Sequence, residues 1–287
     1  MKIKDILSNK KFTLSFEVFP PKIEGDFEKL IKAVIELKRF NPDWVSVTYG
    51  AGGNTKNKSI TIASVLKEFY NLEVLAHLTC TNSSKKDIKD VLYEMERKGI
   101  ENILALRGDP PRGKKFEAIQ DGFAYASELV SFIKKNNGFC MGGACYPQGH
   151  IESSSLENDM DNLKKKVDAG AEFLITQLFF ENNKFYNFVD RAEKAGITIP
   201  INPGIMPITN YHQIKRMTEL TGNEIPFKLK RELETRVSQP EEIEKLGRHY
   251  AAMQAEDLKK NGARGIHFYC MNRSAIVAGI LEMMGYQ

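Results

Sequence analysis

The sequence predicts a single-domain α/β protein of 287 residues in which eight parallel strands alternate with helices and close into a (β/α)8 TIM barrel. Three observations support this fold. Eight short apolar runs recur along the chain, and the segments between them carry apolar residues at every third or fourth position, as amphipathic helices do. Several of these segments end on a glycine, the usual left-handed helix stop: Gly99, Gly138, Gly170, Gly196 and Gly262. Eight such units imply parallel pairing through right-handed crossovers and favour closure into a barrel.

The predicted strands lie, in chain order, in LSFEVFPP (14–21), WVSVTYGAGG (44–53), LEVLAHLTC (72–80), NILALRGDPP (102–111), GGACYPQGH (142–150), FLITQLFF (173–180), IPINPGIMP (199–207) and GIHFYCMNR (265–273). Helical periodicity is clearest in 27–40, 87–99, 123–138, 160–170 and 185–196. The longest interval separates strands seven and eight. We expect it to hold extra helices, which Pro226 and Pro240 would separate.

An open, doubly wound sheet is the competing fold. That fold often carries a G-x-G-x-x-G fingerprint after its first strand, and the nearest match, GAGGN at 50–54, lacks the third glycine. The barrel is therefore favoured, and we predict one domain over residues 1–287.

Composition excludes several classes of function. The net charge of +4 is small, and the lysines are interspersed with Asp and Glu, so no nucleic-acid surface is expected. The four cysteines show no C-x-x-C spacing, which argues against a zinc site or redox pair. No apolar run approaches the roughly 20 residues of a membrane span, and the segment MKIKDILSNKKF is too charged for a signal peptide. We expect a cytoplasmic protein.

In a barrel of this kind the active site lies at the carboxyl ends of the strands. Glu17 stands there inside an apolar strand, where a carboxylate must be paired or must keep its proton, as a catalytic acid would. Asp109 follows the fourth strand in a loop closed by two prolines. The two could form an acid/base pair in apolar surroundings. They could also be ion-paired structural groups, with Asp109 bound to Arg107 at the surface.

Three further motifs have both functional and structural interpretations. His77 could bind a metal, but no second ligand lies at a suitable spacing, so a packed or hydrogen-bonded histidine is favoured and no metal is predicted. The loop CYPQGH could clasp a polar aromatic ligand or form a tight surface turn. One side of a helix carries Asp159, Asn162, Lys165 and Lys166, which taken alone indicate a solvated face.

Ten motifs together carry a family resemblance: SFEVFPP, VSVTYGAGG, HLTC, ALRGDPP, AYA, YPQGH, NLKKKVDAGA, ITQLFF, PGIMPITN and HFYCMNR. In this order, and over nearly the whole chain from Leu14 to Gly285, the sequence resembles the methylenetetrahydrofolate reductases, specifically the catalytic domain of the bacterial type. The resemblance implies a barrel that binds FAD non-covalently. It also implies reduction of 5,10-methylenetetrahydrofolate to 5-methyltetrahydrofolate by a ping-pong hydride transfer from NADH or NADPH. No counterpart of the regulatory domain of the animal enzymes is expected after Gln287.

Carried over by position, the resemblance makes Glu17 the general acid and places Asp109 beside the flavin and the pterin. The implied FAD positions are Thr48, Tyr49, His77, Arg107, Gly108, Asp109, Tyr125, Ala126, Tyr146, His150, Asp159, Asn162, Lys165 and Lys166. The implied folate or nucleotide positions are Glu17, Asp109, Gln177, Gln213 and Arg273. Two residues depart from the family pattern: Gln148 replaces a glutamate, and Met217 stands where some relatives have phenylalanine.

Two other functions stay open on the sequence alone. Another FAD-dependent barrel, such as an amine or imino-acid dehydrogenase, would keep the flavin residues without a pterin clamp. A non-catalytic flavin- or folate-binding protein would need no acid at Glu17. The resemblance also implies a homo-oligomer and leaves NADH, NADPH or a protein partner as the electron donor.

Overall fold

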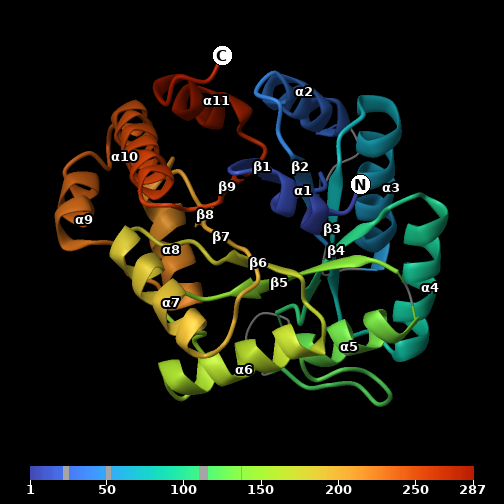
Figure 1. Ribbon diagram of the computed structural model, residues 1–287. Helices are drawn as coiled ribbons and strands as arrows, with labels where there is room; N and C mark the ends of the chain where they lie inside the picture. The colour runs from blue at the N-terminus through green and yellow to red at the C-terminus, as the bar shows by residue number, and fades with distance from the viewer. Residues whose placement is uncertain (22–25, 50–52, 110–115, 137) are drawn as a thin grey trace.

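The computed structural model describes residues 1–21, 26–49, 53–109, 116–136 and 138–287. Within these ranges the chain forms a central parallel sheet that curves into a barrel, with helices around it (Figure 1). The prolines at 110 and 111 and the glycines at 50 and 52 lie outside the described residues, so the motifs built on them are only partly placed.

The strands confirm the predicted (β/α)8 barrel. They are β1 (Thr13–Val18), β2 (Trp44–Val47), β3 (Val74–Thr79), β4 (Asn102–Leu106), β5 (Cys140–Cys145), β6 (Phe173–Thr176), β7 (Ile201–Asn202), β8 (Gly204–Ile205) and β9 (Gly265–Tyr269). Every paired strand is parallel, and the order in the sheet is β7-β6-β5-β4-β3-β2-β1-β9-β8.

The seventh predicted strand is divided into β7 and β8 by Pro203. Proline has no N–H to donate to a ladder, so the strand is interrupted there. The Pro203 carbonyl still accepts from the His267 amide at 2.9 Å. Because β7 pairs with β6 while β8 pairs with β9, the two short pieces together close the barrel.

The helices are α1 (Ile3–Asn9), α2 (Phe27–Lys38), α3 (Gly53–Tyr70), α4 (Lys85–Arg97), α5 (Ala126–Asn136), α6 (Leu156–Ala169), α7 (Asn182–Lys194), α8 (Tyr211–Thr221), α9 (Phe227–Glu234), α10 (Pro240–Lys260) and α11 (Ser274–Met283). The extra helices predicted between the last two strands are α8 and α9, which precede α10 (Figure 1). As expected, Pro226 and Pro240 separate them, at the starts of α9 and α10.

Side chains alternate between the outside and the inside of the barrel. On β1, Leu14, Phe16 and Val18 belong to the core under the helices, so Thr13, Ser15 and Glu17 point inward. Helix α1, which the sequence did not predict, closes the amino end of the barrel. Its residues Ile3, Ile6 and Leu7 share a buried cluster with Trp44 and Phe173 of the barrel interior.

Four of the five predicted glycine stops have positive φ, at Gly99, Gly170, Gly196 and Gly262. The fifth, Gly138, follows residue 137, which lies outside the described residues, so a glycine stop there stays a prediction. No helix among the described residues combines the length and apolar composition needed to cross a bilayer.

Candidate functional site

Glu17 lies at the carboxyl end of β1 and is enclosed by side chains of three strands. Its residue is 7% exposed. Its Oε2 atom lies 3.4 Å from His77 Nε2 on β3 and 3.8 Å from His267 Nε2 on β9. The Glu17 carboxyl group is therefore buried inside the mouth of the barrel, with two imidazole rings as its nearest basic neighbours.

The surroundings of Glu17 hold few alternative proton donors. Burial lowers the pKa of His77, and the nearby Glu17 charge opposes that shift. Burial also raises the pKa of the Tyr269 hydroxyl well above its ordinary value, and the Glu17 charge adds to this effect. Near neutral pH the imidazole is therefore mostly uncharged, and the phenol is a very weak acid.

A large groove, which we call the cationic groove, opens beside the ends of β4 and β5 and has a volume of about 1090 Å³. Nine of the residues that the family resemblance assigned to FAD line it: Arg107, Tyr125, Ala126, Tyr146, His150, Asp159, Asn162, Lys165 and Lys166. The structure thus brings together residues from four segments of the chain that sequence spacing alone could not connect.

Lys166 reaches this groove from α6 across the face of β5. Its Nζ donates to the Ala144 carbonyl at 2.6 Å. A Cβ at Gly143 would lie 2.8 Å from the Lys166 Cδ atom, so glycine at that position leaves space for the lysine stem. Burial lowers the pKa of Lys166, and within the described part of the chain it forms no ion pair. A partly buried cation of this kind is suited to an anionic ligand.

Arg107 pairs with Glu152 and not with Asp109, which corrects the surface pair considered from the sequence. Its two terminal nitrogens donate to the two Glu152 carboxylate oxygens at 2.5 and 2.9 Å. The guanidinium also lies 4.6 Å from the centre of the Phe116 ring. Sequence reasoning missed Glu152 and Phe116, because neither stands at a strand end or in a recognisable motif.

The loop after β5 places two aromatic rings against the cationic groove. Tyr146 and His150 pack edge to face, with ring centres 4.7 Å apart, and both line the groove. The Glu152 amide donates to His150 Nδ1 at 3.1 Å. Burial lowers the pKa of His150 and raises that of Tyr146. The ring pair therefore offers an uncharged, partly apolar wall beside the lysines.

Several predicted residues lie away from the groove lining. Asp109 is exposed, which contradicts the apolar surroundings expected for it. Thr48 and Tyr49 follow β2, and the Tyr49 ring packs against the outer core. Gly108 has φ of +86°, and a Cβ there would lie 2.8 Å from the Thr81 hydroxyl, so this position requires glycine.

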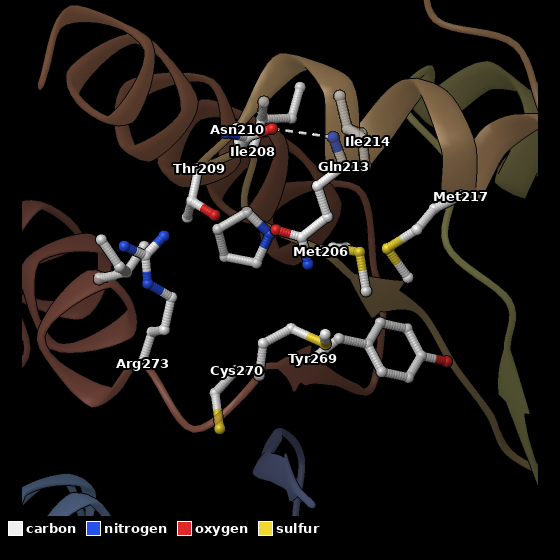
Figure 2. Close-up of a pocket in the computed structure, with 13 residues that line it drawn as sticks. Met206, Ile208, Thr209, Asn210, Gln213, Ile214, Met217, Tyr269, Cys270 and Arg273 are labelled. Carbon is white, nitrogen blue, oxygen red and sulfur yellow. Dashed lines mark hydrogen bonds between the residues drawn. The ribbon is translucent and has the colours of Figure 1, made fainter. Parts of the chain in front are cut away.

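A second pocket lies between α8 and the end of β9 (Figure 2). Gln213 and Arg273, both predicted to bind folate or nucleotide, line it together with Met217 and Tyr269. It continues into an open cavity of about 660 Å³ that Gln213 and Arg273 also line. Gln177 is not among the lining residues of either cavity, and its Oε1 accepts from the Leu178 amide at 2.9 Å.

The sequence analysis also missed His267 and Tyr269, whose side chains face Glu17 and the second pocket. Register pairs Glu17 with Tyr269 and Ser15 with His267, so these four share the interior of the barrel. The sequence contains a pattern that could have identified them. His267 and Tyr269 alternate with apolar residues in GIHFY, as Ser15 and Glu17 do in TLSFEV.

Comparison with known proteins gives the same family as the sequence motifs. The methylenetetrahydrofolate reductase family model matches residues 2–285. The NADH-dependent methylenetetrahydrofolate reductase 1 of Arabidopsis thaliana is 38% identical over 296 residues, covering 99% of this chain and 50% of that protein. The 5,10-methylenetetrahydrofolate reductase of Pectobacterium carotovorum is 33% identical over 276 residues, covering 96% of this chain and 91% of that protein. The chain thus spans about half the length of its plant relatives and most of its bacterial ones.

A solved structure shares the fold. It is a Clostridium thermocellum protein described as binding two copies of 5-methyl-5,6,7,8-tetrahydrofolic acid, with a TM-score of 0.63 over 99% of both chains. Its sequence identity of 13% supports a common fold and nothing more specific.

Proposed function

This chain belongs to the methylenetetrahydrofolate reductase family, and we propose that it reduces 5,10-methylenetetrahydrofolate to 5-methyltetrahydrofolate with FAD as its bound cofactor. The observation that carries the proposal is the position of Glu17, a buried carboxyl group at the mouth of the barrel. The cationic groove opens at the same end of the barrel, beside the ends of β4 and β5. An acid and a dinucleotide-sized groove are the two features that this reaction requires.

The groove residues fit FAD in size and charge. A volume of about 1090 Å³ is large enough for an extended dinucleotide. Lys165 and Lys166 would hold the diphosphate, because the Lys166 ammonium group has no counter-ion among the described residues. Tyr146 and His150 would contact the cofactor through their rings. For the positions outside the groove lining, Thr48, Tyr49, His77, Gly108 and Asp109, contact with FAD stays a prediction.

The bound flavin would supply the hydride chemistry. The protein would supply the proton: Glu17 donates it to N10 of the imidazolidine ring, which opens the ring and leaves the one-carbon unit as an electrophilic iminium. Because the Glu17 residue is only 7% exposed, bulk water competes poorly for this role. Gln213 and Arg273, which line the second pocket, would bind the folate and the nucleotide in turn. For Asp109 and Gln177, contact with the folate stays a prediction.

NADH is the proposed electron donor, since plant relatives carry it in their names. A homo-oligomer in the cytoplasm, working in one-carbon metabolism and supplying methyl groups for methionine synthesis, completes the proposal.

Anaerobic spectroscopy of the two half-reactions tests this function. The purified protein should carry FAD, NADH should bleach its absorbance, and 5,10-methylenetetrahydrofolate should restore it. Tetrahydrofolate without the one-carbon unit is the matched control and should leave the bleached spectrum unchanged. Repeating the first step with NADPH measures the nucleotide preference.

Other results would identify the competing functions. Reoxidation by an imino acid but not by methylenetetrahydrofolate would indicate a different flavin dehydrogenase. Binding of folate without bleaching by either nucleotide, and without turnover from a chemically reduced flavin, would indicate a binding protein. A protein that fails to bind FAD on reconstitution would refute the assignment of the groove.

A further inference from the structure

A column of polar side chains fills the barrel interior below Glu17, and the proposed function gives it no role. The column consists of five residues that are each 0% exposed: Thr13, Ser15, Ser46, Asn202 and His267. The interior of such barrels is usually filled by branched apolar residues. Burying polar groups costs free energy unless they are hydrogen-bonded, so a fully buried column of them calls for an explanation.

His267 is the member that joins this column to Glu17. Its Nδ1 lies 2.8 Å from the Ser15 hydroxyl. Its Nε2 lies 3.4 Å from the Ser46 hydroxyl and 3.8 Å from the Glu17 carboxylate. Because Ser15 pairs with His267 and Glu17 with Tyr269 in the β1–β9 register, the imidazole lies one inward position below the acid. The Tyr269 ring packs edge to face on it at 5.3 Å.

The hydrogen-bond distances indicate which ring nitrogen carries the proton. In an uncharged imidazole one nitrogen donates and the other accepts. The alternative acceptor of the Ser15 hydroxyl, the Ile266 carbonyl, is 3.4 Å away, whereas Nδ1 is at 2.8 Å. The shorter distance favours donation from the hydroxyl to Nδ1, which leaves the hydrogen on Nε2. The opposite tautomer would turn the Nε2 lone pair toward the oxygens of Glu17.

The column does not lead to solvent at the amino end of the barrel. Trp44 and Phe173 are each 0% exposed there, and they pack under Ile3 and Leu7 of α1. These side chains separate the column from solvent at that end, and Glu17 is the ionisable group that His267 faces within 4 Å among the described residues.

We propose that His267 is a positioning residue for Glu17, and that its Nε2–H stabilises the carboxylate that remains after Glu17 has given up its proton. The distance of 3.8 Å exceeds a direct hydrogen bond, and such contacts tighten when substrate is bound. The consequence for catalysis rests on the proposed function, whereas the effect on the ionisation of Glu17 does not.

The titratable groups that face the Glu17 carboxyl group are His77 from β3 and His267 and Tyr269 from β9. The Cys270 thiol, just after β9, donates instead to the Glu17 main-chain carbonyl at 2.7 Å. The β2 strand contributes the uncharged hydroxyl of Ser46. Burial lowers the pKa of His77 and raises those of Tyr269 and Cys270. Tyr269 and Cys270 therefore stay uncharged where a carboxyl group titrates, and the infrared carboxyl band, which an imidazole lacks, separates the ionisation of Glu17 from that of His77.

An infrared pH titration of the purified protein tests the proposal without any turnover. The carboxyl band that disappears in Glu17→Gln reports Glu17. In His267→Asn the shorter amide can still reach Ser15 but supplies no donor at the Nε2 position, so the ionisation midpoint should rise by about one pH unit. His267→Gln places an N–H at the Nε2 position and should return the midpoint to the wild-type value. Thr13→Val removes another hydroxyl of the column and should not move it.

Ser46→Ala provides a second and milder test, in which the ionisation midpoint should shift in the opposite direction. It removes the hydroxyl that competes for the Nε2–H, so the midpoint should fall. An unmoved or lowered midpoint in His267→Asn, equal shifts in the Asn and Gln variants, or a raised midpoint in Ser46→Ala would each overturn the proposal. Should His267→Asn not fold, Ser46→Ala decides. If the wild-type protein is not reoxidised by methylenetetrahydrofolate, the proposed function fails while these midpoints still test His267.

Discussion

Replacing Glu17 with glutamine should separate the two half-reactions of the proposed cycle. Glutamine keeps the size of the side chain and some of its hydrogen bonding but has no proton of comparable acidity to give. Hydride transfer from nicotinamide needs no proton from this residue, so reduction of the flavin by NADH should persist within a few fold. Reoxidation by methylenetetrahydrofolate needs the acid and should become slow.

The structure sets the size of this loss. Two neighbouring groups are poorly suited to replace Glu17, because burial lowers the pKa of His77 and raises that of Tyr269. Solvent is also a weak substitute at a residue that is 7% exposed. The loss should therefore reach at least the ~10²–10⁴-fold typical of a missing general acid, which corresponds to about 3–5 kcal/mol in the barrier.

Rapid mixing under anaerobic conditions measures each half-reaction by the flavin absorbance. Glu172→Gln is the matched control, because Glu172 binds Lys4 at the amino end of the barrel, away from the site. Equal losses in both half-reactions would make Glu17 a structural or flavin-binding residue. No loss in either would mean that another group gives the proton.

Three further results are expected. Lys166→Met should weaken FAD retention in equilibrium dialysis. Lys164→Met on the same helix should not, because Lys164 pairs with Asp168. Equal FAD affinities of the two variants would mean that Lys166 belongs to a solvated helix face. Asp109→Asn should raise the flavin reduction potential in an equilibrium dye titration, because a negative charge beside the ring disfavours the anionic reduced form, and it should slow folate reduction more than flavin reduction. Leu7→Ala should lower the free energy of unfolding by about 2–5 kcal/mol in a denaturant titration, since this 1% exposed side chain seals the barrel; a smaller loss would mean that α1 is loosely packed.

The periodic spacing of apolar residues predicted the barrel, because every strand and every helix needs an apolar face where it packs against the core. Helix α1 escaped prediction because Ile3, Ile6 and Leu7 are few and lie among charged residues, and only the open end of the barrel gives them a partner. The break at Pro203 shows a related limit. Proline signals an interruption in a strand, but only the pairing of β7 and β8 with different neighbours shows that the barrel still closes.

The candidate site was predictable to the extent that its residues stand at strand ends. Glu17 and Arg107 could be selected by that rule. The partner of Arg107 could not, because Glu152 lies 45 positions away and meets the guanidinium only when the loops after β4 and β5 fold together. The nearer carboxylate, Asp109, was favoured by sequence distance, yet it is exposed.

The alternation of side chains along β1 links the fold to the proposed chemistry, because it decides which residues point into the barrel. The same alternation that turns Leu14, Phe16 and Val18 toward the helices turns Ser15 and Glu17 toward the axis. A carboxyl group at the mouth of a sealed barrel is shielded from water but cannot release its proton cheaply unless the resulting charge is stabilised from within. The proposed donor, His267 Nε2, would meet that requirement from the polar layer below the carboxyl group. The polar column is thus best understood as part of the acid and not as a defect of packing.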